Sequence, residues 1–72
     1  MICIEIIVIH NMRRYVVKLE KGTSIKRFKA AVFKAVGVDN GQLISVEDIG
    51  VISDEGSVAD NGLCNGSRVL VI

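Results

Sequence analysis

Few side chains in this sequence could act as a nucleophile, acid or base, and their spacing does not support catalysis. His10 is the single histidine, and the two cysteines are Cys3 and Cys64. A thiol–imidazole pair would need His10 with one of these cysteines, but no Ser-His-Asp or Cys-His-Asn spacing accompanies it. A solvated turn histidine and two small, reduced, hydrophobic cysteines explain these residues more simply. We therefore expect no enzyme activity and no catalytic residue.

The sequence also lacks a recognisable metal or cofactor motif. Asp54, Glu55 and Asp60 fall in one turn-rich stretch, but they do not follow the EF-hand pattern. Iron–sulfur clusters need four cysteine ligands, and two are present. The seven glycines are scattered singly, so none forms a GxGxxG or P-loop motif. We expect neither a metal nor a cofactor.

Length and composition indicate one small folded unit. Half of the 72 residues are hydrophobic and 24% are charged, which argues against disorder. A chain this short forms a small core, so we expect a single domain over residues 1–72 without a deep pocket. The first apolar run carries Glu5 and is shorter than the roughly 20 residues of a membrane span. We expect no membrane association and a cytoplasmic location, with the nucleus as the alternative.

The formal net charge of +1 conceals an asymmetry between the two halves of the chain. Residues 1–36 hold eight basic and two acidic residues, a balance of +6, whereas residues 37–72 hold one basic and six acidic residues, a balance of −5. The small net charge disfavours nucleic-acid binding, which uses a basic excess. Segregated charge of both signs points instead to protein partners.

The first third of the chain has the pattern of a β-hairpin. Residues 2–9 are β-branched and almost continuously apolar, which predicts a strand buried on both faces. Residues 10–13 supply a turn in which Asn11 tolerates a positive φ. Residues 14–21 then alternate apolar and polar side chains, so the second strand should be half solvated.

A helix and three further strands follow. Thr23 or Ser24 can cap the helix and Gly37 ends it. Residues 42–46 and 50–52 are short strand candidates, and residues 68–72 close the chain as a strand. The apolar stripe of the helix, at helical spacing, comprises Ile25, Phe28, Val32, Ala35 and Val36.

This element order predicts an α+β fold of the β-grasp type. The two apolar strands at the ends of the chain would pair in parallel at the centre of the sheet, through a right-handed crossover. The expected architecture is a mixed four- to five-stranded sheet packed on one helix.

Several blocks of sequence carry a resemblance to a known family. The most specific block, residues 58–63, places an apolar residue, a small residue, Asp60, two turn residues and an apolar anchor before the last strand. The side-chain types of three further blocks also match the pattern of this family, namely residues 20–25, 42–44 and 67–72. In these blocks the chain resembles ubiquitin and its relatives, as a divergent member. The resemblance implies a non-catalytic protein-interaction module. Within such a family the fold carries over between members better than the biological role does. Modifiers of this family end in two glycines, so a modifier role would require a tail beyond Ile72.

An apolar surface is the leading candidate for partner binding. If Val69 and Val71 point inward, Leu70 and Ile72 stand on the outer face of the last strand. The resemblance implies that this face is the recognition patch, completed by residues near Ile9 and on the third strand. The register of the third strand is uncertain by one residue, which leaves open whether Leu43, Ser45 or Val46 faces outward. The residues expected to bind partner proteins are therefore Leu70, Ile72, Leu43, Val46 and Ile9.

An electrostatic surface supports an alternative function. Basic residues on the second strand, a sheet edge open to pairing, and acidic residues in the loop before the last strand should lie on opposite sides. Such a molecule could bind its own copy head-to-tail and act as a self-associating scaffold domain, a homo-oligomer. The residues expected to carry this association are Arg13, Arg14 and Lys18 against Asp54, Glu55 and Asp60.

Overall fold

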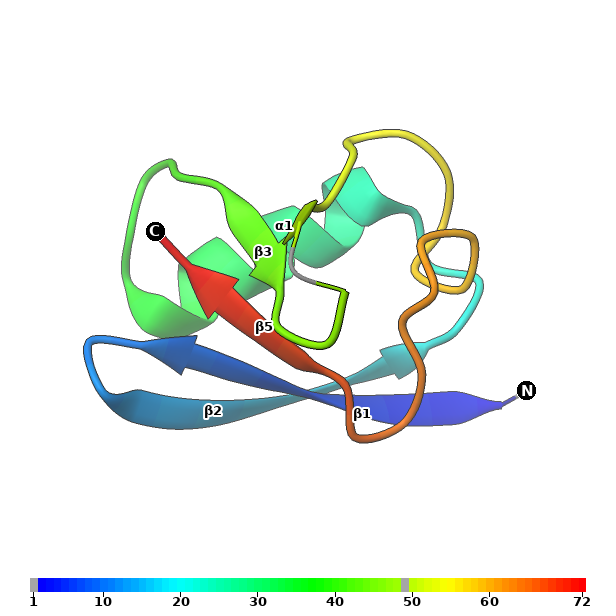
Figure 1. The fold of residues 1–72 in the computed structure, drawn as a ribbon, viewed down its shortest axis with the longest axis horizontal. Helices are drawn as coiled ribbons and strands as arrows, with labels where there is room; N and C mark the ends of the chain where they lie inside the picture. The colour runs from blue at the N-terminus through cyan, green and yellow to red at the C-terminus, as the bar shows by residue number, and fades with distance from the viewer. Residues whose placement is uncertain (1, 49) are drawn as a thin grey trace.

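The computed structural model describes residues 2–48 and 50–72. Within these ranges the elements are β1 (Cys3–His10), β2 (Arg13–Glu20), α1 (Ile25–Val36), β3 (Leu43–Ser45), β4 (Gly50–Val51) and β5 (Arg68–Val71). The strands form one sheet in the order β2-β1-β5-β3-β4 (Figure 1). β1 and β5 pair in parallel at its centre, and the other pairs are antiparallel. The predicted β-grasp, with the two terminal strands side by side, is confirmed.

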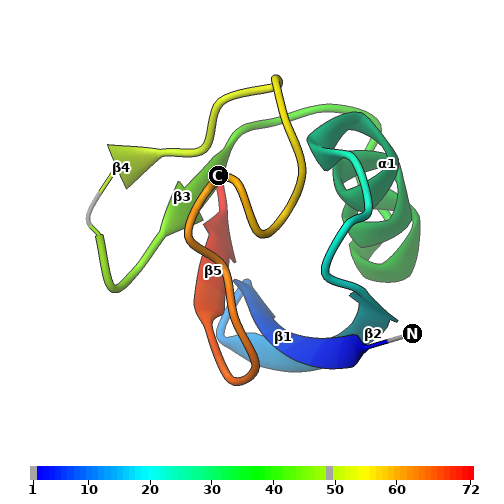
Figure 2. The same cartoon turned by 90° about the vertical axis from the view of Figure 1, so that its right-hand side faces the viewer.

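The sheet curves around the helix and leaves its other face open. Helix α1 lies inside the concave side of the sheet, and no described element covers the convex side (Figure 2). β1 shows the consequence, because Ile4, Ile6 and Val8 are buried whereas Ile7 and Ile9 are only half-buried. The prediction that this strand is buried on both faces is therefore wrong. One helix covers one face only.

Helix α1 is capped by Ser24, one of the two residues that the sequence offers for this position, and ends at Gly37 as predicted. Ser24 Oγ accepts a hydrogen bond from the backbone N–H of Arg27 at 3.3 Å. Gly37 has a φ of 79°, the left-handed conformation that favours glycine at a helix end. Ala35, expected in the apolar stripe, is exposed, and Phe33 packs against the core instead. The buried residues of the helix are Ile25, Phe28 and Val32.

The long segment between β4 and β5 closes the core over the start of the helix. Ile52, Val58 and Leu63 are buried within it. The Val58 N–H donates to the Thr23 carbonyl oxygen at 2.8 Å, and the Ile25 N–H donates to the Gly56 carbonyl oxygen at 3.0 Å. These backbone bonds hold the loop against the helix entrance.

One turn explains why Asp60 and Asn61 occur in the block at residues 58–63. The Ser57 N–H donates to Asp60 Oδ2 and the Asp60 N–H donates to Ser57 Oγ, both at 3.0 Å. The Asn61 side chain donates to the Glu55 and Ser57 carbonyl oxygens at 3.0 and 2.9 Å. Asp60 and Asn61 therefore satisfy backbone groups that the loop leaves without a strand or helix partner.

The turn between β1 and β2 holds two residues in the left-handed conformation. Asn11 and Met12 have φ values of 50° and 63°. Two left-handed residues make the type I′ turn, whose twist matches that of the flanking strands. Asn tolerates this conformation, but Met12 does so against its intrinsic preference, and its 99% exposed side chain makes no compensating contact.

We expect Met12→Gly to raise the free energy of unfolding by about 0.5–1 kcal/mol, because glycine removes the left-handed strain at the second turn position. Urea denaturation measures this change. Met12→Ala is the matched control: it removes the same side chain but retains the strain, so its stability should stay close to that of the parent. Equal stabilisation by both variants would contradict the explanation.

Candidate functional site

The register of the sheet brings apolar side chains from four strands into one row. Ile9 of β1 pairs with Leu70 of β5, Leu70 pairs with Ile44 of β3, and Ile44 pairs with Val51 of β4. Directly paired residues point to the same face of a sheet, which here is the convex face. Ile72 follows two positions after Leu70 and reaches the same face. We call Ile9, Ile44, Val51, Leu70 and Ile72 the sheet-face patch.

Parts of this patch project strongly into solvent. Val51 and Ile72 are 62% and 61% exposed, whereas Ile9, Ile44 and Leu70 are half-buried by their neighbours. Leu70 and Ile72 lie on the outer face as predicted, because Val69 and Val71 are buried in the core on the opposite face.

One residue expected in the patch, Leu43, lies elsewhere. Leu43 is 1% exposed and belongs to the core, because it pairs with Val71 on the face covered by α1. Ile44 therefore takes the outer position that was predicted for Leu43. Val46 follows the end of β3 and is half-buried. Its N–H donates to the Arg68 carbonyl oxygen at 3.0 Å, which continues the pairing of β3 with β5, so the role of Val46 in partner binding stays a prediction.

The sequence contains no local signal that could have identified Ile44. Leu43 and Ile44 are consecutive apolar residues, so alternation cannot tell which of them faces the core. Val51, also absent from the predicted set, sits in a strand of two residues, which is too short to show a period.

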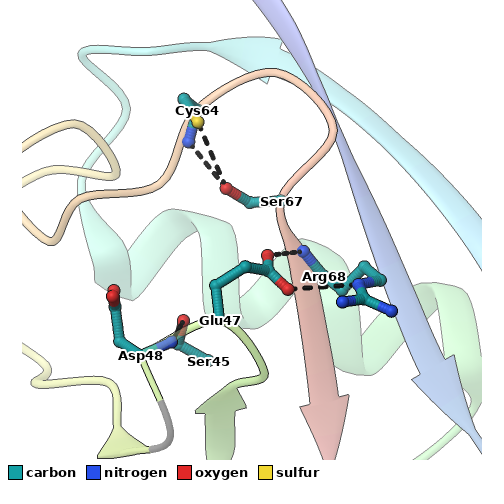
Figure 3. A network of polar contacts seen from close by, with 6 residues as sticks. All are labelled: Ser45, Glu47, Asp48, Cys64, Ser67 and Arg68. Atoms are coloured by element: carbon teal, nitrogen blue, oxygen red, sulfur yellow. Dashed lines mark hydrogen bonds and ion pairs between the residues drawn. The ribbon is translucent and has the colours of Figure 1, made fainter.

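Two arginines border the patch, and their electrostatic situations differ. Arg14 pairs with Ile9 and stands at the β2 end of the row, whereas Arg68 precedes Leu70 by two positions on β5. Glu47 Oε1 accepts the backbone N–H of Arg68 at 2.7 Å, and Glu47 Oε2 accepts from its Nε at 3.1 Å (Figure 3). Among the described residues Arg14 forms no ion pair. The charge of Arg68 is therefore neutralised by Glu47, whereas the charge of Arg14 is not paired within the described residues.

The neighbouring polar side chains shape loops. Ser67 Oγ accepts the backbone N–H of Cys64 at 2.9 Å, and Ser45 Oγ accepts that of Asp48 at 3.4 Å (Figure 3). His10 Nδ1 lies 3.4 Å from the Val71 carbonyl oxygen. Within residues 2–48 and 50–72, no group of three or more His, Cys, Asp or Glu residues is arranged to hold a metal ion. Over the same residues, no helix is both long and apolar enough to cross a membrane.

The residues predicted to self-associate are exposed, but two of them are engaged within the chain. Arg13, Arg14 and Lys18 stand on β2, at one edge of the sheet. Asp54 Oδ1 forms an ion pair with Lys29 Nζ at 2.9 Å. Asp60 accepts the hydrogen bond from Ser57 described above, so of the three acids only Glu55 keeps its carboxylate clear of the described ion pairs and hydrogen bonds. Self-association stays a prediction.

Comparisons with known proteins identify the fold. No family model matches the sequence, and no curated protein sequence matches it. The structure is similar to the ubiquitin-like domain of Arabidopsis thaliana protein At2g32350, with a TM-score of 0.82 and 15% identity over 97% of this chain and 76% of that one. It is also similar to the N-terminal ubiquitin-like domain of the 4931431F19Rik protein, with a TM-score of 0.82 and 21% identity over 97% and 73% of the two chains.

A third similar structure is that of ATBAG1 in complex with HSP70. Its TM-score is 0.81 at 11% identity, over 96% of this chain and 39% of that one. Identities this low establish the fold alone. The chain has the ubiquitin-like β-grasp fold, in a divergent form, and the predicted resemblance is confirmed at that level.

The register of β3 makes a direct stability prediction. Leu43→Ala should lower the free energy of unfolding by about 3 kcal/mol, because it leaves a cavity in the core, whereas Ile44→Ala should lower it by only about 1 kcal/mol. Chemical denaturation of the two variants provides the measurement. The reverse order would mean that Ile44 is the buried residue, and that β3 is shifted by one position.

Proposed function

We propose that this protein is a non-catalytic, ubiquitin-like interaction module that binds a partner protein through the sheet-face patch. The observation that carries the proposal is the row of apolar side chains across four adjacent strands on the open face of the sheet. Exposed apolar residues that cluster in this way normally mark an interaction site, whereas singly scattered ones do not. The Leu43 side chain, buried in the core, has no part in this function.

The shape and charge of the patch specify the chemistry of a suitable partner. Four neighbouring strands span about 14 Å between the outer two, because adjacent strands lie about 4.8 Å apart. An amphipathic helix of about ten residues covers that length with one apolar face. Arg14 stands at one end of the row, so the partner helix should carry an acidic side chain at that end.

The similar structures support a protein partner. The fold of this chain corresponds to 76%, 73% and 39% of the three chains described above, so in ATBAG1 it is part of a much longer protein. That ATBAG1 structure is a complex with HSP70. A domain carried within a longer chain is consistent with an interaction module.

Titration of the isotope-labelled protein with a ubiquitin-binding amphipathic helical peptide tests this proposal by amide NMR shifts. The perturbed amides should be those of Ile9, Ile44, Val51 and Leu70. Leu70→Ala should weaken the affinity by about tenfold, because it truncates the centre of the apolar row. Shifts that avoid the patch would contradict the proposal.

Val16→Ala is the matched control for the loss of an apolar side chain. Val16 is 62% exposed on the same face of the sheet but lies on β2, outside the patch. We expect this variant to bind the helical peptide as tightly as the parent. Thermal unfolding of both variants verifies that a loss of binding does not reflect a loss of structure.

A further inference from the structure

Asparagine is followed by glycine at three places in this chain, each in a connection between two elements. The pairs are Asn40-Gly41, Asn61-Gly62 and Asn65-Gly66. In such a pair the backbone nitrogen of the glycine can attack the side-chain amide of the asparagine, because glycine has no Cβ to obstruct the approach. This reaction needs no enzyme, so the folded structure decides which of the three pairs can react.

The chemistry is a cyclisation followed by hydrolysis. The glycine nitrogen bonds to the asparagine Cγ, and the side-chain nitrogen leaves with the glycine proton as ammonia, which closes a cyclic succinimide. Water then opens the ring at Cγ to give aspartate, or at the backbone carbonyl carbon to give isoaspartate. In isoaspartate the main chain runs through Cγ and is longer by one carbon atom. Water is the only co-reactant, and nothing is oxidised or reduced.

The turn before β5 restrains Asn61-Gly62 on both sides of the reacting bond. The Asn61 side-chain nitrogen donates to the Glu55 and Ser57 carbonyl oxygens. The Gly62 N–H donates to the Ala59 carbonyl oxygen at 3.0 Å. Cyclisation would break these bonds, because the amide nitrogen must leave and the glycine nitrogen must lose its proton. Asn61 is therefore protected while the turn is folded.

Strand β1 restrains Asn65-Gly66 in a similar way. Asn65 Oδ1 accepts the backbone N–H of Glu5 at 2.9 Å, and the Gly66 N–H donates to the Glu5 carbonyl oxygen at 2.8 Å. These two bonds extend the contact of β1 with the segment that leads into β5. Reaction at Asn65 therefore requires local opening of this contact.

Asn40-Gly41 lies between α1 and β3 and has neither kind of restraint. Asn40 is exposed, and its side chain makes no hydrogen bond within residues 2–48 and 50–72. The Gly41 N–H likewise has no acceptor among the described residues. Both reacting groups are thus available in the folded protein.

Close packing against the end of β5 requires the glycine of this pair. Gly41 has a φ of 151°, and a Cβ atom at this position would lie 2.7 Å from the Ile72 carbonyl oxygen. The following residue, Gln42, donates its N–H to the Ile72 carbonyl oxygen at 3.0 Å and accepts the Ile72 N–H at 3.1 Å (Figure 1). The fold therefore keeps a glycine after Asn40 and leaves the asparagine unrestrained.

We propose that Asn40 is a spontaneous modification site, at which the folded protein deamidates to aspartate and isoaspartate. Isoaspartate lengthens the main chain directly before the tight contact of Gly41 with Ile72, so the Gln42–Ile72 pair should open and Ile72 should leave the sheet-face patch. Aspartate adds only a negative charge at an exposed position. The expected effect on partner binding rests on the proposed function, whereas the chemistry at Asn40 does not.

Incubation of the purified protein in mildly alkaline buffer tests the site preference, because alkali promotes loss of the glycine proton. Cleavage after Glu47 and Glu55 separates the peptide with Asn40 from the peptide with the other two pairs. Mass spectrometry with electron-transfer fragmentation then identifies aspartate and isoaspartate at each position. Deamidation of Asn40 should be at least about tenfold faster than that of Asn61 or Asn65, which react only from opened states.

The unfolded chain is the control for local sequence. In guanidinium chloride the three pairs should deamidate at rates within about threefold of one another, because the restraints of the fold are lost. Asn40→Gln is the matched variant, since its longer side chain would have to close a larger ring that forms more slowly. It should remain unmodified at position 40 and keep the circular dichroism of the parent.

Hydrogen exchange measured by NMR tests the structural consequence. The isoaspartate form, separated by chromatography, should lose protection at the Gln42 and Ile72 amides, whereas Asn40→Asp should keep it. The isoaspartate form should also bind the helical peptide about threefold more weakly, because one member of the apolar row is displaced. If the unmodified protein does not bind that peptide, the proposed function fails, while the mass and exchange measurements still decide the modification.

Two results would overturn the proposal. Deamidation of Asn61 or Asn65 in the folded protein as fast as that of Asn40 would show that the fold does not select the site. Unchanged protection of Gln42 and Ile72 in the isoaspartate form would show that the longer main chain is accommodated without opening the pair.

Discussion

The placement of β5 between β1 and β3 is the constraint on which the rest of the structure depends. Val69 and Val71 are buried in the core, and burial of a valine side chain is worth about 1.5 kcal/mol or more. A one-residue shift of β5 would expose both valines and turn Arg68 and Leu70 toward the core. The two buried valines therefore fix which residues of β5 face the core and which face outward. This facing in turn decides which residues of β1 and β3 can share the convex face.

The open convex face and the open β2 edge both result from incomplete coverage of the sheet. One helix and one long loop pack on the concave side, so the convex face and the β2 edge stay open in the described structure (Figure 2). The open face collects apolar residues from four strands, and the open edge carries basic residues. Arg14 stands where the two surfaces meet, since it pairs with Ile9 and also belongs to β2.

Local sequence patterns predicted every element, because each pattern is complete within a few residues. The alternation in β2, the Ser24 cap and the Gly37 end of the helix needed no knowledge of distant contacts. Local patterns did not predict which face of a strand is buried where this depends on pairing with another strand or on coverage by another element. Consecutive apolar residues at 43 and 44 left the facing of β3 open, and the continuous apolar run of β1 concealed that only one of its faces is covered.

The sequence by itself determined the β-grasp fold and the charge imbalance between the two halves of the chain, because these follow from strong β and helix signals and from composition. The outward placement of Leu70 and Ile72 was a conditional prediction within an unbroken apolar run, and the structure decided it. Only the tertiary structure decided that Ile44 replaces Leu43 on the surface, and that the Asp54 carboxylate is paired with Lys29. Both depend on contacts between segments far apart in the chain. Such contacts are set by register and packing of the whole sheet, which no local pattern records.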